Sequence, residues 1–136
     1  MNQYLLDTNV ISELRKIRPH GAVLAWLNAN EEARLFVSAV TVGELQAGVE
    51  RTRRQDPAKA SELERWVDGV PAVYRVLPMD TACFRECARI MHNKQPELLQ
   101  DAMIAATARV HGLVVATRNE RDFTQLGVRT FNPFKN

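Results

Sequence analysis

Four acidic residues in separate parts of the chain have a spacing that could bring them to one site. They are Asp7, Glu44, Asp101 and Asp122. A set of oxygen ligands without His or Cys suits Mg²⁺ or Mn²⁺ rather than zinc. Two such ions about 4 Å apart generate a hydroxide and stabilise the leaving oxygen in an in-line displacement at phosphorus. The four acids therefore predict metal-assisted phosphodiester hydrolysis, a reaction that needs no histidine or serine nucleophile.

Each acid also has a purely structural explanation, which the sequence leaves open. Asp7 or Thr8 could cap the helix that follows it. The stretch Thr41-Val-Gly-Glu44 matches a capping box, and Asn119-Glu-Arg-Asp122 is a looser version of the same pattern. Asp101 would be favoured near a helix N-terminus by the helix dipole, by about 0.3–1 kcal/mol.

Two details favour the metal site over these caps. The helical stretch around Asp101 is apolar nearly all round, which indicates a buried helix, and a cap does not require a carboxylate a full turn inside it. A buried carboxylate without a partner is costly unless a cation or a hydrogen-bond donor compensates it. No lysine neighbours Asp7 or Asp101 in the sequence. A divalent metal would also remove the repulsion among several carboxylates on one rim.

The elements that must position these acids alternate between short apolar strands and longer helices. Strands are expected at 3–7, 35–38, 74–77, 113–117 and 128–131. Helices are expected at 10–16, 41–54, 57–70, 81–91 and 96–110, with another opened by Pro19 and a helical turn at 119–123. Strands joined through helices form a mostly parallel sheet, so the predicted fold is a three-layer α/β/α sandwich with four to five strands. Ligands bind beyond the carboxyl ends of such strands, and all four acids can reach that rim.

Length and composition exclude several classes of protein. A chain of 136 residues with 46% hydrophobic and 25% charged residues predicts one globular domain over residues 1–136, not a disordered tail. Two cysteines four positions apart, Cys83 and Cys87, exclude a disulfide framework and a Cys-x2-Cys zinc motif, and we expect both to be buried. Asp7 and Glu13 interrupt any N-terminal signal peptide, and no apolar run is long enough to span a membrane. We therefore expect a soluble, reduced, cytoplasmic protein.

The basic residues give a weaker indication. A net charge of +2 is too small to indicate nucleic-acid binding, although 14 of the 18 basic residues are arginines, which suit forked contacts with phosphate. Arginine is equally a good helix former on solvated faces. Arg118 lies nearest the acids and is the candidate for a phosphate contact. Trp26 and Trp66 have the helical spacing of core or interface residues rather than of base-stacking platforms.

Four motifs, in order along the whole chain, resemble those of PIN-domain ribonucleases, and more closely the VapC/FitB toxins of bacterial toxin–antitoxin pairs. The motifs are Tyr-Leu-Leu-Asp7-Thr8-Asn9-Val-Ile-Ser-Glu, Ser38-Ala-Val-Thr-Val-Gly-Glu44-Leu, Asp101-Ala-Met-Ile-Ala-Ala-Thr-Ala and Ala116-Thr117-Arg118-Asn119-Glu-Arg-Asp122-Phe123. The terminal Asn132-Pro133-Phe134 also resembles that group.

The resemblance implies a Mg²⁺- or Mn²⁺-dependent endoribonuclease that acts on structured RNA such as tRNA and inhibits translation and growth. Asp7, Glu44 and Asp101 match the acidic triad of the family, and Asp122 matches its usual fourth acid. Thr8, Thr117 and Asn119 match polar positions beside the metals. The resemblance further implies a homodimer, and a small VapB/FitA-like antitoxin that fills the active-site groove with its C-terminal tail and binds operator DNA.

Two alternatives belong to other classes. A catalytically silent PIN-like scaffold would only bind protein or RNA. A phosphatase with Asp7 as its nucleophile commonly has a second acid two residues on, where this chain has Asn9.

Overall fold

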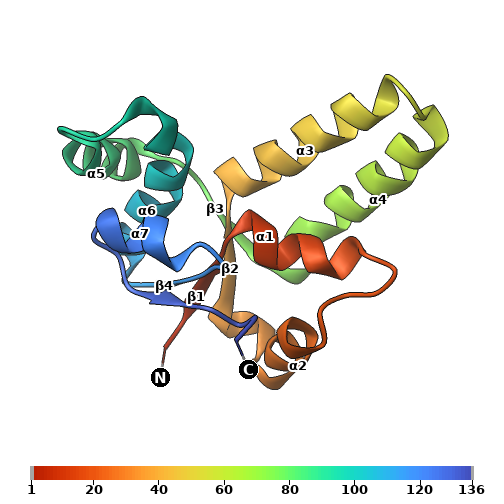
Figure 1. Cartoon of the computed structure of the whole chain (residues 1–136), viewed down its shortest axis with the longest axis horizontal. Helices are drawn as coiled ribbons and strands as arrows, with labels where there is room; N and C mark the ends of the chain where they lie inside the picture. Colours follow the sequence, from red (N-terminus) through yellow and green to blue (C-terminus); the bar gives the residue numbers. More distant parts are fainter. Residues whose placement is uncertain (1, 136) are drawn as a thin grey trace.

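The structure, a computed structural model, describes residues 2–135 and contains one all-parallel sheet in the strand order β3-β2-β1-β4-β5 (Figure 1). The strands are β1 (Tyr4–Leu6), β2 (Leu35–Ser38), β3 (Arg75–Leu77), β4 (Val114–Ala116) and β5 (Thr130–Phe131). Every neighbouring pair is parallel, so all carboxyl ends face the same edge. The predicted α/β/α sandwich with a mostly parallel sheet is confirmed.

Helices cover both faces of this sheet. They are α1 (Thr8–Ile11), α2 (Gly21–Ala29), α3 (Ala39–Arg53), α4 (Pro57–Val73), α5 (Thr81–Met91), α6 (Leu99–His111) and α7 (Glu120–Gln125). Short 3₁₀ turns lie between them: η1 (Ser12–Arg15), η2 (Glu32–Arg34) and η3 (Pro96–Leu98). No helix within residues 2–135 is long and apolar enough to cross a membrane.

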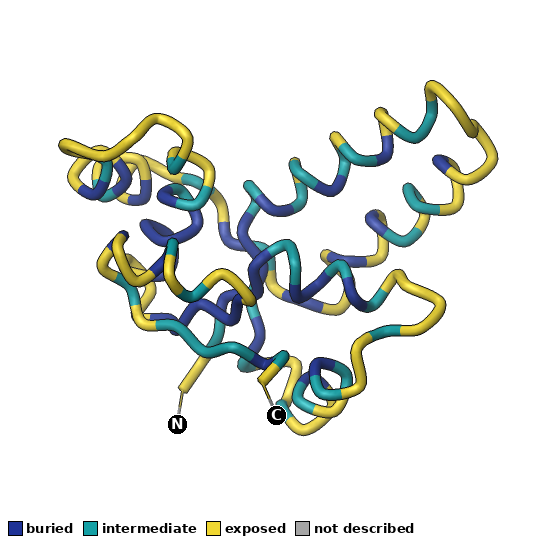
Figure 2. Tube along the Cα trace, viewed as in Figure 1, coloured by how far each residue is buried: buried dark blue, intermediate teal, exposed yellow. Residues whose placement is uncertain are grey.

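The central strand β1 divides the core into two halves because its side chains alternate between the faces. Leu6 packs in a cluster that includes residues of α1, α2, α3 and α4, whereas Leu5 packs with residues of α5, α6 and α7. The buried segments of Figure 2 converge on this strand, and the outer helices are exposed on their far sides. Cys83 and Cys87 are buried free thiols, as predicted.

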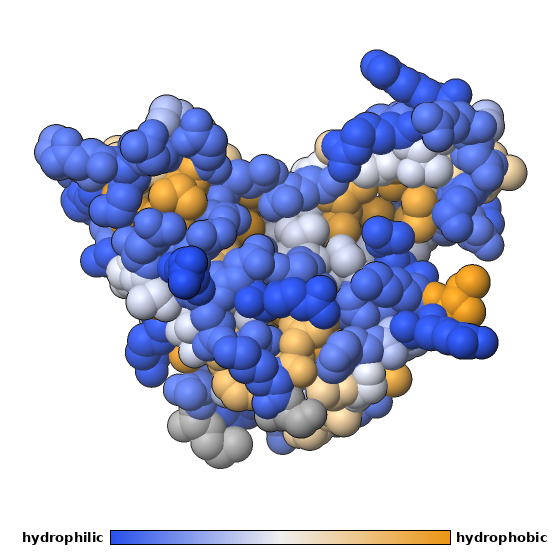
Figure 3. Space-filling model, viewed as in Figure 1, coloured by the Kyte–Doolittle hydropathy of each residue, from blue (hydrophilic) through white to orange (hydrophobic). Residues whose placement is uncertain are grey.

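Helices α3 and α4 pack against each other as an arm that extends away from the sheet (Figure 1). The second arm consists of α5 and α6. Figure 3 shows the surface hollowed between the two arms, above the carboxyl ends of the strands. The fold therefore places an open depression where the acids were expected.

Several predicted boundaries are wrong by a few residues, for local reasons. The first helix splits into α1 and η1. Pro19 lies outside α2, because the extended His20 serves as the N-cap. Helix α4 continues past Pro71 to Val73. Pro96 opens η3 and the α-helix begins only at Leu99, so Asp101 lies in the first turn of α6 rather than a full turn inside a helix.

Candidate active site

Asp7 is the most buried of the four acids, with 4% of its surface exposed at the end of β1. Its backbone N–H donates to the Ala116 carbonyl at 2.9 Å, which fixes the residue against the end of β4. As the N-cap of α1, its Oδ1 accepts the Thr8 N–H at 2.8 Å. Burial raises the pKa of the Asp7 carboxyl, although the hydrogen bonds that it accepts oppose the shift. The predicted cap is therefore real, but it uses only one carboxylate oxygen.

The second oxygen of Asp7 accepts hydrogen bonds from a neighbouring residue and from the distant loop after β4. Thr117 Oγ1 donates to Asp7 Oδ2 at 2.7 Å, and Asn9 Nδ2 donates to the same oxygen at 3.1 Å. The Thr117 hydroxyl also accepts the Asn119 N–H at 2.9 Å. The exposed Asn119 makes no side-chain cap hydrogen bond to α7, so the looser capping box is wrong.

Glu44 reaches the same rim from α3. Ser38, not Thr41, caps this helix, since Ser38 Oγ accepts the Val40 N–H at 3.0 Å. The predicted capping box is therefore wrong, and Glu44 is left to face the site. Burial, followed by the charges of Asp7 and Asp101, raises the pKa of Glu44, and the nearby Thr8 hydroxyl partly opposes this shift.

Asp101 and Asp122 complete the group from the opposite side. Asp101 is half-buried in the first turn of α6, and Asp122 lies in the first turn of α7. Burial, and then the negative charges of Asp7 and Asp122, raise the pKa of Asp101 to about 6. The structure thus places all four predicted acids within electrostatic reach of at least one other.

The four acids form no ion pairs with a lysine, arginine or histidine in the part of the chain that the structure describes, residues 2–135. In the same range, no three His, Cys, Asp or Glu side chains are close enough to hold a metal ion by themselves. Mg²⁺ retains several waters and binds through one or two carboxylates plus substrate phosphate, so it does not require such a cluster. Carboxylates without a cation, in a site with no His or Cys donor, fit Mg²⁺ or Mn²⁺.

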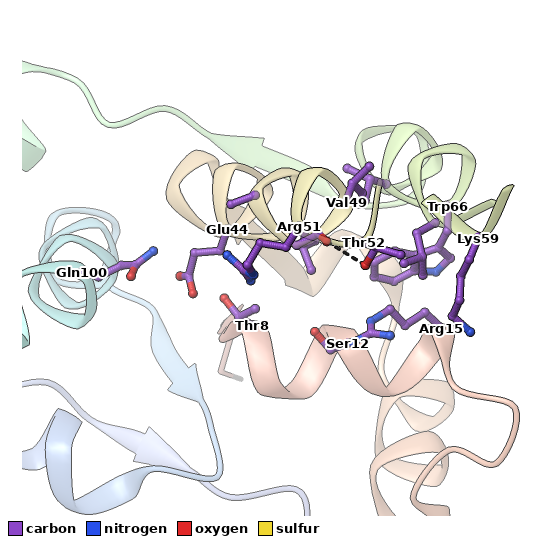
Figure 4. A pocket seen from close by; sticks show the side chains of 15 residues that line it. Thr8, Ser12, Arg15, Glu44, Val49, Arg51, Thr52, Lys59, Trp66 and Gln100 are labelled. Atoms are coloured by element: carbon purple, nitrogen blue, oxygen red, sulfur yellow. Dashed lines mark hydrogen bonds between the residues drawn. The ribbon is translucent and has the colours of Figure 1, made fainter. Parts of the chain in front are cut away.

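A pocket of about 530 Å³ leads away from this group between η1, α3 and α4. Figure 4 shows Glu44 and Thr8 facing each other at one end, with Gln100 of α6 across from them. Arg15 and Lys59 lie at the other end (Figure 4). The site is therefore an open groove, with Arg51 beside Glu44 at the end near the strands and further basic side chains at the other end (Figure 4).

Sequence reasoning missed the role of Asn9. Its Nδ2 donates to Asp7, while its Oδ1 accepts the backbone N–H of Arg118 at 3.2 Å. Asn9 therefore connects the first acid to the loop after β4. The signal was its position two residues after Asp7, but its second partner lies 109 positions away.

The family model described as the PIN domain matches residues 4–128. The chain belongs to the PIN-domain family. This PIN-domain chain is 39% identical to VapC ribonuclease Y4jK of Sinorhizobium fredii, covering 96% of its own length and 97% of that relative. It is 37% identical to toxin FitB of Neisseria gonorrhoeae, over 96% of the chain and 97% of that toxin. The resemblance to VapC and FitB proteins is thereby confirmed.

Solved structures show the same relationship. The FitAcB crystal structure from Neisseria gonorrhoeae superposes with a TM-score of 0.88 at 34% identity, covering 98% of this PIN-domain chain and 100% of that chain. A DNA-bound VapBC structure from Salmonella typhimurium gives a TM-score of 0.77 at 28% identity, over 98% and 99% of the two chains. The shared region thus includes both arms and the site between them.

Proposed function

We propose that this PIN-domain protein is a Mg²⁺- or Mn²⁺-dependent endoribonuclease toxin of a toxin–antitoxin pair. The observation that carries the proposal is the group of four carboxylates at the carboxyl edge of the sheet, where burial, and then neighbouring negative charge, raises the pKa of Asp101 and Glu44. Such a group is unfavourable by itself and becomes favourable when it binds divalent cations. When bound, the metal would supply an activated water and stabilise the leaving oxygen at phosphorus.

The side chains have distinct parts in this proposal. Asp7, Glu44, Asp101 and Asp122 would hold the divalent metal through their carboxylates. Thr117 orients Asp7 through the 2.7 Å hydrogen bond. Thr8 faces Glu44 in the pocket (Figure 4), and the exposed Asn119 side chain would orient a ligand of the metal.

The proposed substrate is structured RNA of the tRNA type, and cleavage would inhibit translation and growth. A relative that supports this substrate is the tRNA(fMet)-specific endonuclease VapC of Shigella flexneri, 29% identical over 93% of the chain and 94% of that relative. Arg118, at the edge of the acidic group, would contact an RNA phosphate.

The proposed partner is a VapB/FitA-like antitoxin that blocks the groove with its C-terminal tail and binds operator DNA. The structural relatives that support this include FitAB bound to the IR36 DNA fragment, with a TM-score of 0.85 at 33% identity. The proposal also includes a homodimer and a cytoplasmic location.

The test is to map new RNA 5′ ends minutes after induced expression of the wild type and of Asp101→Asn. A small set of ends present only with the wild type is expected. Glu97→Gln, which neutralises an exposed acid in the preceding turn, is the matched control and should reproduce the wild-type ends. Cleavage of bulk bacterial tRNA by purified protein, with Mn²⁺ or with EDTA, tests the metal requirement.

Identical 5′-end profiles for the wild type and Asp101→Asn, together with no metal-dependent cleavage in vitro, would reject the nuclease and favour the silent scaffold.

A further inference from the structure

The C-terminal segment contacts the loop that follows β4 and the start of α7. Asn132 Oδ1 accepts the Phe134 N–H at 2.9 Å, and this local turn, together with the buried Pro133, fixes the direction of the Phe134 ring. Lys135 Nζ lies 3.3 Å from Glu120 Oε1 at the start of α7. The segment is therefore attached to the loop that carries Asn119 and Arg118.

The Phe134 ring is in direct contact with Arg118. The Arg118 Cζ atom lies 3.8 Å from the ring centroid, a cation–π geometry. The ring of His20 lies against Phe134 with centroids 5.1 Å apart and planes at 67°. Phe134 is thus held between His20 and the guanidinium.

The backbone of Arg118 is fixed as well. Its N–H donates to Asn9 Oδ1 at 3.2 Å, and Asn9 in turn donates to Asp7. The preceding residue is Thr117, which donates to the same carboxylate. Arg118 therefore directly follows Thr117, which contacts Asp7. Its backbone is held by Asn9, and its guanidinium is held by the Phe134 ring.

The Arg118 guanidinium forms no ion pair with the described residues, 2–135. The nearby carboxyl on which its charge acts, that of Glu13, is buried and already accepts hydrogen bonds from Lys16 Nζ and the His20 N–H. Arg118 itself is exposed.

A ring stacked on a guanidinium occupies its face and leaves its edge free. All five N–H donors of arginine lie in the guanidinium plane, so the fork that binds phosphate remains available. We infer that Phe134 is a positioning residue that fixes the Arg118 guanidinium beside the loop after β4, as a ligand for a backbone phosphate of the RNA strand. This inference rests on the proposed nuclease function and adds the C-terminal segment to the substrate site.

A merely structural role would give a different result. If the contact served only to attach the C-terminus, loss of the ring would reduce stability without a selective effect on RNA affinity. The test therefore needs variants that separate the ring from general packing.

Steady-state cleavage of 5′-labelled bulk bacterial tRNA with Mn²⁺ provides the first measurement. Arg118→Ala is expected to raise KM about tenfold, the effect of one charge-assisted contact. Phe134→Leu, which keeps apolar volume but removes the ring, is expected to raise KM about two- to fivefold with kcat within about twofold. Phe134→Trp should restore KM. Phe131→Leu is the matched control, since this ring packs on Tyr4 and Trp26 instead, and it should leave KM unchanged.

NMR of the Arg118 Nε–Hε group gives a readout independent of activity. The ring should shift this signal upfield in the wild type, and Phe134→Leu, but not Phe131→Leu, should abolish the shift. If the wild type cleaves no tRNA, the proposed function fails, and the dissociation constants of the same variants for uncleaved tRNA take the place of KM. An unchanged KM or dissociation constant in Arg118→Ala, or in Phe134→Leu, overturns the inference.

Discussion

Replacing Asp101 with asparagine is expected to stabilise the metal-free protein at neutral pH, although the same change should abolish cleavage. The reason is that burial, and then the negative charges of Asp7 and Asp122, makes the ionised form of Asp101 unfavourable. Asparagine has nearly the same shape and no charge. The substitution therefore removes a repulsion that exists only without the cation.

The magnitude follows from the shift in pKa. A rise from 3.8 to about 6 corresponds to about 3 kcal/mol at 1.36 kcal/mol per unit, as an upper limit. Asp101 is only half-buried, so solvent screening reduces this to about 1.5 kcal/mol. The loss of a negative charge from the first turn of α6 opposes the gain by about 0.5 kcal/mol. The net expectation is about 1 kcal/mol in favour of the variant.

The sign depends on pH in a defined way. The folded-state pKa of Asp101 lies above its unfolded value of 3.8, so the folded protein binds this proton more tightly. The destabilisation by ionised Asp101 is absent below pH 3.8, grows as the pH rises towards about 6, and is complete above that. The advantage of the variant should therefore be largest at pH 7.5 and smaller at pH 5.

Thermal unfolding followed by circular dichroism in EDTA measures this directly. At pH 7.5 the midpoint of Asp101→Asn should lie about 3–4 °C above that of the wild type, for a net gain of about 1 kcal/mol in a domain of this size. Glu97→Gln, which neutralises an exposed acid in η3, should move the midpoint by less than about 1 °C. A variant midpoint equal to or below the wild-type value at pH 7.5 would refute the electrostatic reasoning.

Three further expectations concern the metal, the Asp7 network and the core. Saturating Mn²⁺ should raise the thermal midpoint of the wild type at pH 7.5 and have a much smaller effect on Asp101→Asn; equal shifts would place the cation elsewhere. Thr117→Val should cost about 1–3 kcal/mol in urea denaturation because it removes the 2.7 Å donor to the buried Asp7, whereas Thr117→Ser should cost less, and equal losses would argue against the hydroxyl. Phe123→Ala, fully buried, should cost about 3–5 kcal/mol in the same assay. Phe84→Ala, with Phe84 55% exposed, should cost under about 0.5 kcal/mol, and similar losses for both would contradict the assigned core.

The order and type of the elements could be predicted because each rests on a local pattern. The run Leu35–Ser38 and the helix Thr81–Met91 have the predicted bounds, since strand and helix periodicities are visible in adjacent residues. Local sequence patterns could not predict a helix boundary where two residues were both suitable as the N-cap. Both Ser38 and Thr41 are good N-cap residues, and only the end of β2 decides that the helix begins at Ala39.

The acids could be predicted as a group because parallel strands bring their carboxyl ends to one edge. The hydrogen bonds and ring contacts around these acids could not be predicted from the sequence. Asn9 joins Asp7 to Arg118 across 109 positions, and Phe134 meets Arg118 through the path of the C-terminal segment. Such pairs depend on three-dimensional placement, which no spacing within a single sequence shows.

The position of β1 in the sheet has a consequence for synthesis on the ribosome. The strand that precedes Asp7 is made well before its neighbour β4, and Leu6 pairs in register with Ala116. A nascent chain that has not reached Thr117 lacks the donor that orients Asp7, and one that stops before Phe134 lacks the ring on Arg118. Translation must therefore pass β4 and Thr117 before the acidic rim is assembled, so fragments that stop earlier do not carry the site.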